Sequence, residues 1–186
     1  TKKISSSVEN YAQAIVEGLG EVFEQNNLSG ANVQEVLHGT TVASNAILEH
    51  KGAKTGLIGT KGFRDVLEIR NLRMPRLYDL HWEKPAPLVE RYLRLVVDER
   101  VNTTGDIVHP LDPADAEAVV DRLLSEAVEV IAVSLINSFA NPAHEQMIKE
   151  IIGRKAPDMP VCISFDVLPE IKEYERTSTT VINAYL

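Results

Sequence analysis

The run from His38 to Asn45 gathers a histidine, a glycine turn, two threonine hydroxyls and an amide within eight residues. Residues 33–37 predict a short strand before it, and a helix is expected from about Val42 to Glu49. Strand ends in α/β sheets gather ligands, and the free N–H groups of a helix start favour an anion or a carbonyl oxygen. The alternative is that a threonine only caps the helix while the histidine packs against a neighbour. The candidates for lining a substrate or nucleotide cleft are His38, Gly39, Thr40, Thr41 and Asn45.

A second strand-to-helix turn spans Thr60 to Asp65. Residues 55–58 predict the strand before it, and residues 63–69 predict a short helix after it. In a parallel sheet this turn lies on the same edge as the first run. Lys61 is then placed to neutralise a phosphate or a developing oxyanion. The alternative is a solvated turn in which Arg64 and Asp65 form a surface ion pair.

Two further polar sets could serve a site. Arg70, Arg73 and Arg76 form a local positive cluster, which either holds a carboxylate or phosphate bidentately or belongs to a solvated loop. The stretch from Glu173 to Thr180 lies on a predicted final helix, where its charges either form helix-face pairs or line a hinge between domains. Arg176 and Ser178 are the hinge candidates.

Composition narrows the function classes. The formal net charge of −8 argues against nucleic-acid or anionic-membrane binding, because both need a basic surface. The single cysteine, Cys162, excludes a disulfide within the chain and favours a buried strand cysteine over a nucleophile. No apolar run approaches the roughly 18 residues that span a bilayer, and no secretory signal is present. We therefore expect a cytoplasmic protein. Metal-ligand pairs, P-loops and nucleophile elbows are absent from the sequence.

Strands and helices alternate along most of the chain, which predicts an α/β fold with a mostly parallel sheet and crossover helices. Apolar residues between Val8 and Phe23 recur at helical spacing and predict a helix with one buried face. Asp112-Pro113 and Asn141-Pro142 mark two later helix starts, and the apolar run from Val128 to Ile136 predicts a central strand. Residues 79–110 are expected to form a small β insertion, and residues 161–165 another strand. Because the chain begins without Met and stops inside a helix, we interpret it as a fragment.

Taken together, these motifs resemble the N-terminal domain of the hydantoinase A / 5-oxoprolinase family, which includes N-methylhydantoinase and proteins like the acetone carboxylase beta subunit. The resemblance covers nearly the whole chain from about Val33 onward. The stretches that carry it are His38–Glu49, Lys51–Arg70, Arg76–Leu80, Asp98–Arg100 and Tyr174–Leu186.

The resemblance implies part of an actin-like (ribonuclease H-like) ATPase fold spanning residues 1–186. It also implies an ATP- and Mg-dependent cytoplasmic hydrolase that opens a cyclic amide, such as a hydantoin, 5-oxoproline or a related lactam, through a phosphorylated carbonyl. A second large subunit or further domains of the same chain are the expected partners. The alternatives are a subunit of an ATP-dependent ketone carboxylase, of the acetone or acetophenone type, and a non-catalytic scaffold fragment.

Two departures from the family pattern limit these expectations. The family's first phosphate-binding hairpin, which is acidic and contains Gly-Gly-Thr, has no counterpart before Ser6. We therefore expect this fragment to be inactive alone and to bind no cofactor tightly. At Ile69-Arg70-Asn71 the family commonly has a glycine after the isoleucine, whereas this chain has an arginine.

Overall fold

The computed structural model describes residues 3–4, 11–37, 39–71, 78–79 and 81–186. The chain divides into two compact units, residues 1–41 and residues 42–186. The second unit holds all the strands found among the described residues.

The first unit contains one long helix, α1 (Tyr11–Asn26), and a short 3-10 turn, η1 (Gly30–Asn32). The expected strand at residues 33–37 is wrong: the described residues offer it no pairing partner, and Leu37 is 87% exposed. A lone extended segment gains nothing from strand geometry, because its backbone groups find no ladder. The expected buried face of α1 is also incomplete, since Val16 is 67% exposed.

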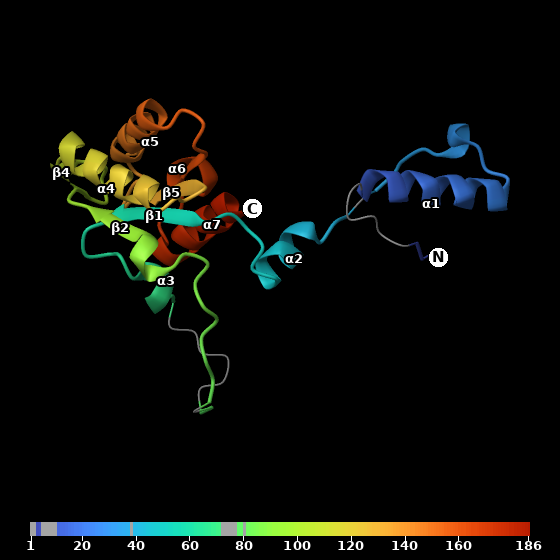
Figure 1. The fold of residues 1–186 in the computed structure, drawn as a ribbon, viewed down its shortest axis with the longest axis horizontal. Coiled ribbons are helices and arrows are strands. Elements are labelled where there is room, and N and C mark those ends of the chain that lie inside the picture. The colour runs from blue at the N-terminus through green and yellow to red at the C-terminus, as the bar shows by residue number, and fades with distance from the viewer. Residues whose placement is uncertain (1–2, 5–10, 38, 72–77, 80) are drawn as a thin grey trace. The chain divides into compact units, whose positions relative to one another are not determined.

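A four-stranded parallel sheet forms the centre of the second unit (Figure 1). Its strand order is β2-β1-β5-β6, and every neighbouring pair is parallel. The prediction of an α/β fold with a mostly parallel sheet is therefore confirmed. The strands are β1 (Thr55–Thr60), β2 (Arg94–Val97), β5 (Val130–Ser134) and β6 (Val161–Ile163).

Helices cover both faces of this sheet, with α4 and α5 above it and α3 and α7 below it in Figure 1. Asp112 caps α4 as predicted, because its carboxylate accepts the N–H of Ala114 at 2.9 Å. No helix among the described residues is long and apolar enough to cross a membrane. The helices are α2 (Val42–Leu48), α3 (Val66–Ile69), α4 (Pro113–Ser125), α5 (Ala143–Lys155), α6 (Ser164–Val167) and α7 (Glu173–Tyr185), with a 3-10 turn η2 (Arg91–Leu93).

Three element boundaries differ from the sequence-based expectations. Within residues 79–110, β2 joins the main sheet, and the separate antiparallel pair consists only of β3 (Arg100–Val101) and β4 (Ile107–His109). The strand expected at 161–165 ends at Ile163, where the chain turns into α6. The helix expected at 63–69 is shorter, because residues 61–65 form the turn that follows β1. The alternation of apolar and polar residues along a strand does not indicate which sheet the strand joins.

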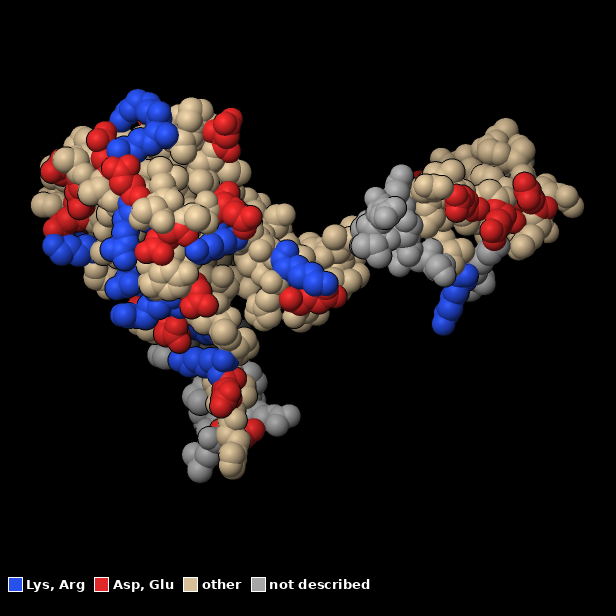
Figure 2. All heavy atoms as spheres, in the orientation of Figure 1, with Lys and Arg blue, Asp and Glu red and all other residues tan. Residues whose placement is uncertain are grey.

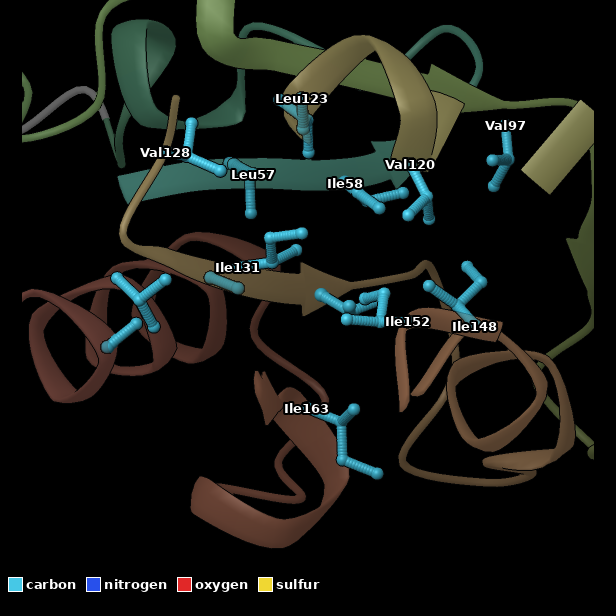
Figure 3. Packing of buried hydrophobic residues seen from close by; sticks show 14 of the residues in the cluster. Leu57, Ile58, Val97, Val120, Leu123, Val128, Ile131, Ile148, Ile152 and Ile163 are labelled. Carbon is cyan, nitrogen blue, oxygen red and sulfur yellow. The ribbon is translucent and has the colours of Figure 1, made fainter. Parts of the chain in front are cut away.

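The apolar core lies between the sheet and its helices (Figure 3). All residues of β1 and β5 are buried, as expected of central parallel strands covered on both faces. Leu123 of α4 is fully buried, and a Cβ added at Gly56 would lie 3.0 Å from its methyl groups. Gly52 permits a similar close approach, because a Cβ there would collide with the ring of Tyr185.

We predict that Leu123→Ala lowers the free energy of unfolding by about 2–5 kcal/mol, because it removes a fully buried side chain from a packed core. Urea unfolding of the 186-residue chain measures this loss. The matched control is Leu48→Ala on α2, whose side chain is 78% exposed and should change stability little. Equal losses in the two variants would contradict this packing.

Candidate functional site

In the sheet, β2 lies on one side of β1, whereas β5 and then β6 lie on its other side. The direction in which successive strands are added therefore reverses between β1 and β5. In open parallel sheets, the carboxyl ends of the strands at such a reversal are the usual place for a ligand. The turn from Lys61 to Asp65 directly follows the carboxyl end of β1. This edge of the sheet is therefore the candidate site.

Lys61 is held at this edge by a tight turn and an ion pair. Gly62 has φ +92°, and the N–H of Phe63 donates to the carbonyl of Thr60 at 2.9 Å. The Lys61 ammonium lies 2.5 Å from a carboxylate oxygen of Asp98, which follows β2. This hydrogen bond raises the pKa of Lys61 and lowers the pKa of Asp98. Both groups are exposed, so the pair holds the Lys61 ammonium in place at the surface, with its charge offset by the Asp98 carboxylate.

Beneath this exposed pair lies a buried hydrogen-bond chain. The hydroxyl of Thr60 donates to Glu99 and accepts the backbone N–H of Ile136 at 2.9 Å. The other oxygen of Glu99 accepts from Nδ1 of His144 at 2.8 Å. Nε2 of His144 accepts the N–H of Leu111 at 3.3 Å, which assigns the ring proton to Nδ1. These hydrogen bonds join the end of β1, the residues that follow β2 and the start of α5 at the carboxyl edge.

A second buried carboxylate, Glu145, organises the loop after β5. It accepts the N–H groups of Leu135 and Phe165 and the hydroxyl of Ser164, at 2.6–3.0 Å. Burial raises the pKa of Glu145, and these hydrogen bonds partly oppose the rise. Arg176 of α7 donates to the carbonyl of Leu135 at 2.7 Å, and burial lowers its pKa while Glu145 opposes the change.

Arg176 is only 1% exposed, so it anchors the start of α7 within the second unit. Its Nε atom has no hydrogen-bond partner among the described residues. Ser178, the other hinge candidate, is half-buried and lines a hollow of about 300 Å³ together with residues of α2 and α7. The assignment of these two residues to an interdomain hinge stays a prediction.

A cluster of opposite charges lies over β2 and α3 (Figure 2). Asp65 pairs bidentately with Arg91 at 2.9 and 3.0 Å, so the expected Arg64–Asp65 surface pair is wrong. Arg64 instead donates to the carbonyl of Arg91 at 2.7 Å. Arg94, 3% exposed, reaches Glu68 at 3.2 Å. The Arg91 hydrogen bond lowers the pKa of Asp65.

A hollow of about 430 Å³ lies between α3 and the start of α7. Its lining combines apolar side chains with charged and amide groups. This volume falls within the range of roughly 300–1,000 Å³ typical of small-molecule sites. We call it the α3–α7 hollow. Its lining residues are Phe63, Val66, Ile69, Arg70, Asn71, Lys172, Glu173, Tyr174 and Glu175.

The first candidate run is divided between the two units. His38 lies outside the described residues, and Gly39, Thr40 and Thr41 belong to the first unit. Asn45 lies on α2 in the second unit, where its carbonyl accepts the N–H of Glu49 at 2.9 Å. The role of this run in a cleft with Lys61 stays a prediction. Arg73 and Arg76 also lie outside the described residues.

Sequence reasoning missed the buried groups that shape this edge, namely Glu99, His144 and Glu145. One signal was available for Glu99, which lies between the apolar residues Val97 and Val101 near a strand end. A carboxylate in such a position needs a buried partner. His144 and Glu145 follow a predicted helix start, and there the first turn of a helix is usually exposed.

We predict that Glu99→Ala lowers the free energy of unfolding by about 3 kcal/mol, because it leaves the Thr60 hydroxyl and His144 Nδ1 buried without an acceptor. Urea unfolding is the measurement. Asp98→Ala is the neighbouring control, and it should have the small effect expected of an exposed ion pair. A Glu99 variant as stable as the Asp98 variant would show that these buried hydrogen bonds do not stabilise the carboxyl edge of the sheet.

Comparison with known proteins identifies the family. The chain matches the family model of the hydantoinase/oxoprolinase N-terminal region over residues 1–156. Caprolactamase subunit alpha from Pseudomonas jessenii is 41% identical over 152 residues, a match covering 81% of this chain and 22% of that subunit.

Solved structures give the same result. The crystal structure of ATP-dependent caprolactamase from Pseudomonas jessenii is similar over 100% of this chain and 28% of that one, with a TM-score of 0.85 and 36% identity. Nucleotide-free acetone carboxylase is similar over 97% of this chain and 28% of that one, with a TM-score of 0.85 and 27% identity. The fold is consistent with the expected actin-like architecture. The chain spans about a quarter of these relatives' length, and it belongs to the hydantoinase/oxoprolinase family.

Proposed function

We propose that this chain is the N-terminal part of an ATP-dependent enzyme that opens a cyclic amide. The observation that carries the proposal is the likeness to ATP-dependent caprolactamase, which extends over the whole chain at a TM-score of 0.85. At 36% identity, the likeness reaches beyond the general fold. A lactam, a hydantoin or 5-oxoproline is the substrate class, and hydrolysis of the ring amide is the reaction.

In this proposal the chain binds and orients the substrate. Lys61 offers a positive charge at the carboxyl edge of the sheet, and Asp98 holds it in place. The buried chains around Glu99 and Glu145 keep the neighbouring loops rigid, which preserves the position of groups facing a ligand. In the α3–α7 hollow, the side chains of Phe63, Val66 and Ile69 supply apolar surface for ring methylenes.

In this proposal the chain supplies only part of the site for ATP and Mg²⁺. Within the described ranges, no group of three or more His, Cys, Asp or Glu side chains is placed to hold a metal ion. The basic side chains Lys61, Arg91 and Arg94 are already paired with carboxylates. We therefore propose that other parts of a longer cytoplasmic protein, or a second large subunit, complete the nucleotide site.

A second candidate function is a subunit of an ATP-dependent ketone carboxylase. The observation that favours it is the TM-score of 0.85 with acetone carboxylase over 97% of the chain. The reaction then joins bicarbonate to a ketone instead of adding water to an amide. The two candidates differ in the co-substrate that stimulates ATP hydrolysis.

We expect the full-length protein to hydrolyse ATP faster in the presence of a cyclic amide. The measurement is phosphate release during a screen of hydantoin, 5-oxoproline, lactams of five to seven ring atoms, and ketones with bicarbonate. Stimulation that requires both bicarbonate and a ketone would replace the hydrolase with the carboxylase. No stimulation by any cyclic amide would contradict the hydrolase proposal.

We further predict that Thr41→Ala or Lys61→Ala lowers amide-stimulated ATP hydrolysis of the full-length protein more than about 10-fold, because each removes a polar group proposed to face the reacting centre. Steady-state kinetics give the measurement. Lys54→Ala is the control for lysine removal, since Lys54 lies at the opposite, amino end of β1 and donates to the carbonyl of Glu126. Parental kinetics in both test variants would reject the site assignment.

A further inference from the structure

Three consecutive residues after β2 each contact the turn that follows β1. The three contacts are an ion pair, a buried hydrogen bond and a cation–π contact. They join Asp98 to Lys61 at 2.5 Å, Glu99 to Thr60, and the guanidinium of Arg100 to the ring centre of Phe63 at 4.9 Å. We call residues 98–100 the 98–100 clamp, because together they hold the turn at residues 60–63.

The clamp and the turn match each other in exposure. Successive side chains of an extended segment point to opposite sides, so Asp98 faces solvent while Glu99 is only 2% exposed. In the turn, Thr60 is fully buried and Lys61 is exposed. An exposed ion pair is weak by itself, because solvent screens it. The buried contact between Glu99 and Thr60 therefore fixes the turn from which Lys61 projects.

Thr60 carries a hydroxyl where a valine of the same shape would suit the strand. All of β1 is buried, and a buried hydroxyl costs free energy unless it is hydrogen-bonded. Here the hydroxyl donates to Glu99 and accepts the N–H of Ile136 at 2.9 Å. One side chain thus joins the end of β1 to the segments that follow β2 and β5. Valine would fill the same space and lose both hydrogen bonds.

The buried network is not arranged to exchange protons with a ligand. Glu99 and His144 resemble an acid–base pair, with His144 Nδ1 2.8 Å from the carboxylate. His144 is 3% exposed, however, and its Nε2 accepts the N–H of Leu111 at 3.3 Å. An imidazole whose two nitrogens are both bonded inside the protein does not reach a substrate proton. The network instead holds neighbouring groups in position.

We propose that Thr60 and Glu99 are positioning residues, which hold Lys61 against Asp98 and thereby set the rate of the reaction that Lys61 serves. The inference rests on the proposed function for that reaction and on the 98–100 clamp for the position of Lys61. A displacement of about 1 Å near a reacting centre can lower a rate about 100-fold, so buried residues that touch no ligand can control it.

The reactivity of Lys61 toward an acylating reagent tests its position without any substrate. The hydrogen bond to Asp98 raises the pKa of Lys61, so at a given pH the paired ammonium is acylated slowly. The full-length parent and its variants are treated with acetic anhydride. Mass spectrometry then measures the acetylation rate of Lys61 relative to that of Lys54, which lies at the other end of β1.

We expect Thr60→Val to raise this acetylation ratio about 3-fold, because the pKa of Lys61 returns toward its ordinary value. Thr60→Ser keeps the hydroxyl and should retain the parental ratio. Glu99→Gln keeps the side-chain length but offers one acceptor oxygen in place of two, so it should match Thr60→Val. A parental ratio in Thr60→Val or in Glu99→Gln overturns the proposal.

A double-mutant cycle tests whether Thr60 acts through Lys61. The value of kcat/KM for amide-stimulated ATP hydrolysis is measured in the full-length parent, Thr60→Val, Lys61→Ala and the double variant. We expect Thr60→Val to lower it about 10-fold in the parent and less than about 2-fold beside Lys61→Ala, since no ammonium is then left to position. Equal falls in the two backgrounds would assign Thr60 a general structural role and reject the proposal.

Thr55→Val is the matched control. Thr55 is also a buried threonine of β1, 2% exposed, but its hydroxyl donates to the carbonyl of Ala53 at 2.9 Å, away from the carboxyl edge. Its replacement should change neither the acetylation ratio nor kcat/KM. Changes equal to those of Thr60→Val would mean that loss of any hydroxyl from this strand moves Lys61, which contradicts the clamp.

The two measurements separate this proposal from the proposed function, because acetylation needs neither ATP nor a cyclic amide. A ratio that rises in Thr60→Val, in a protein whose ATP hydrolysis no cyclic amide stimulates, retains the positioning of Lys61 and rejects the hydrolase. Amide-stimulated ATP hydrolysis that Thr60→Val lowers equally with and without Lys61 retains the hydrolase and rejects the positioning.

Discussion

The second unit depends on the parallel pairing of β1 with β5. This pairing brings residues 55–59 against residues 130–134, and all of them are buried. Because β2 and β6 then extend the sheet in opposite directions, the loops after β1 and β5 diverge at the carboxyl edge. Their polar groups must therefore find partners at that edge. The site, the buried carboxylates and the α3–α7 hollow all follow from this one arrangement.

Two buried carboxylates supply hydrogen-bond acceptors for these polar groups. Glu99 and Glu145 accept hydrogen bonds from strand ends, helix starts and loops far apart in the sequence. Desolvation offsets much of the attraction in a buried polar network, whereas removal of one partner leaves the others buried without a hydrogen bond. They leave the exposed groups Lys61 and Asp98 on a rigid base, which suits a surface that must present charge in a fixed position.

The chain spans about a quarter of the relatives' length, so the comparison with them concerns that part alone. The relatives include an ATP-dependent caprolactamase and an acetone carboxylase, so the shared architecture serves more than one reaction. What distinguishes one chemistry from another must lie in the groups that face the ligand.

The sequence alone determined the fold class and the main helix and strand positions, because periodicity and caps such as Asp112-Pro113 are local properties. The family came from the resemblance of stretches such as His38–Glu49 and Lys51–Arg70. Tertiary structure decided which strands pair, so β2 joined the main sheet and residues 33–37 formed no strand. It also decided the partners of charged groups. Asp65 forms an ion pair with Arg91 and not with Arg64, and Glu99 accepts a hydrogen bond from His144. Such contacts join residues distant in the chain, and periodicity along the sequence carries no information about them.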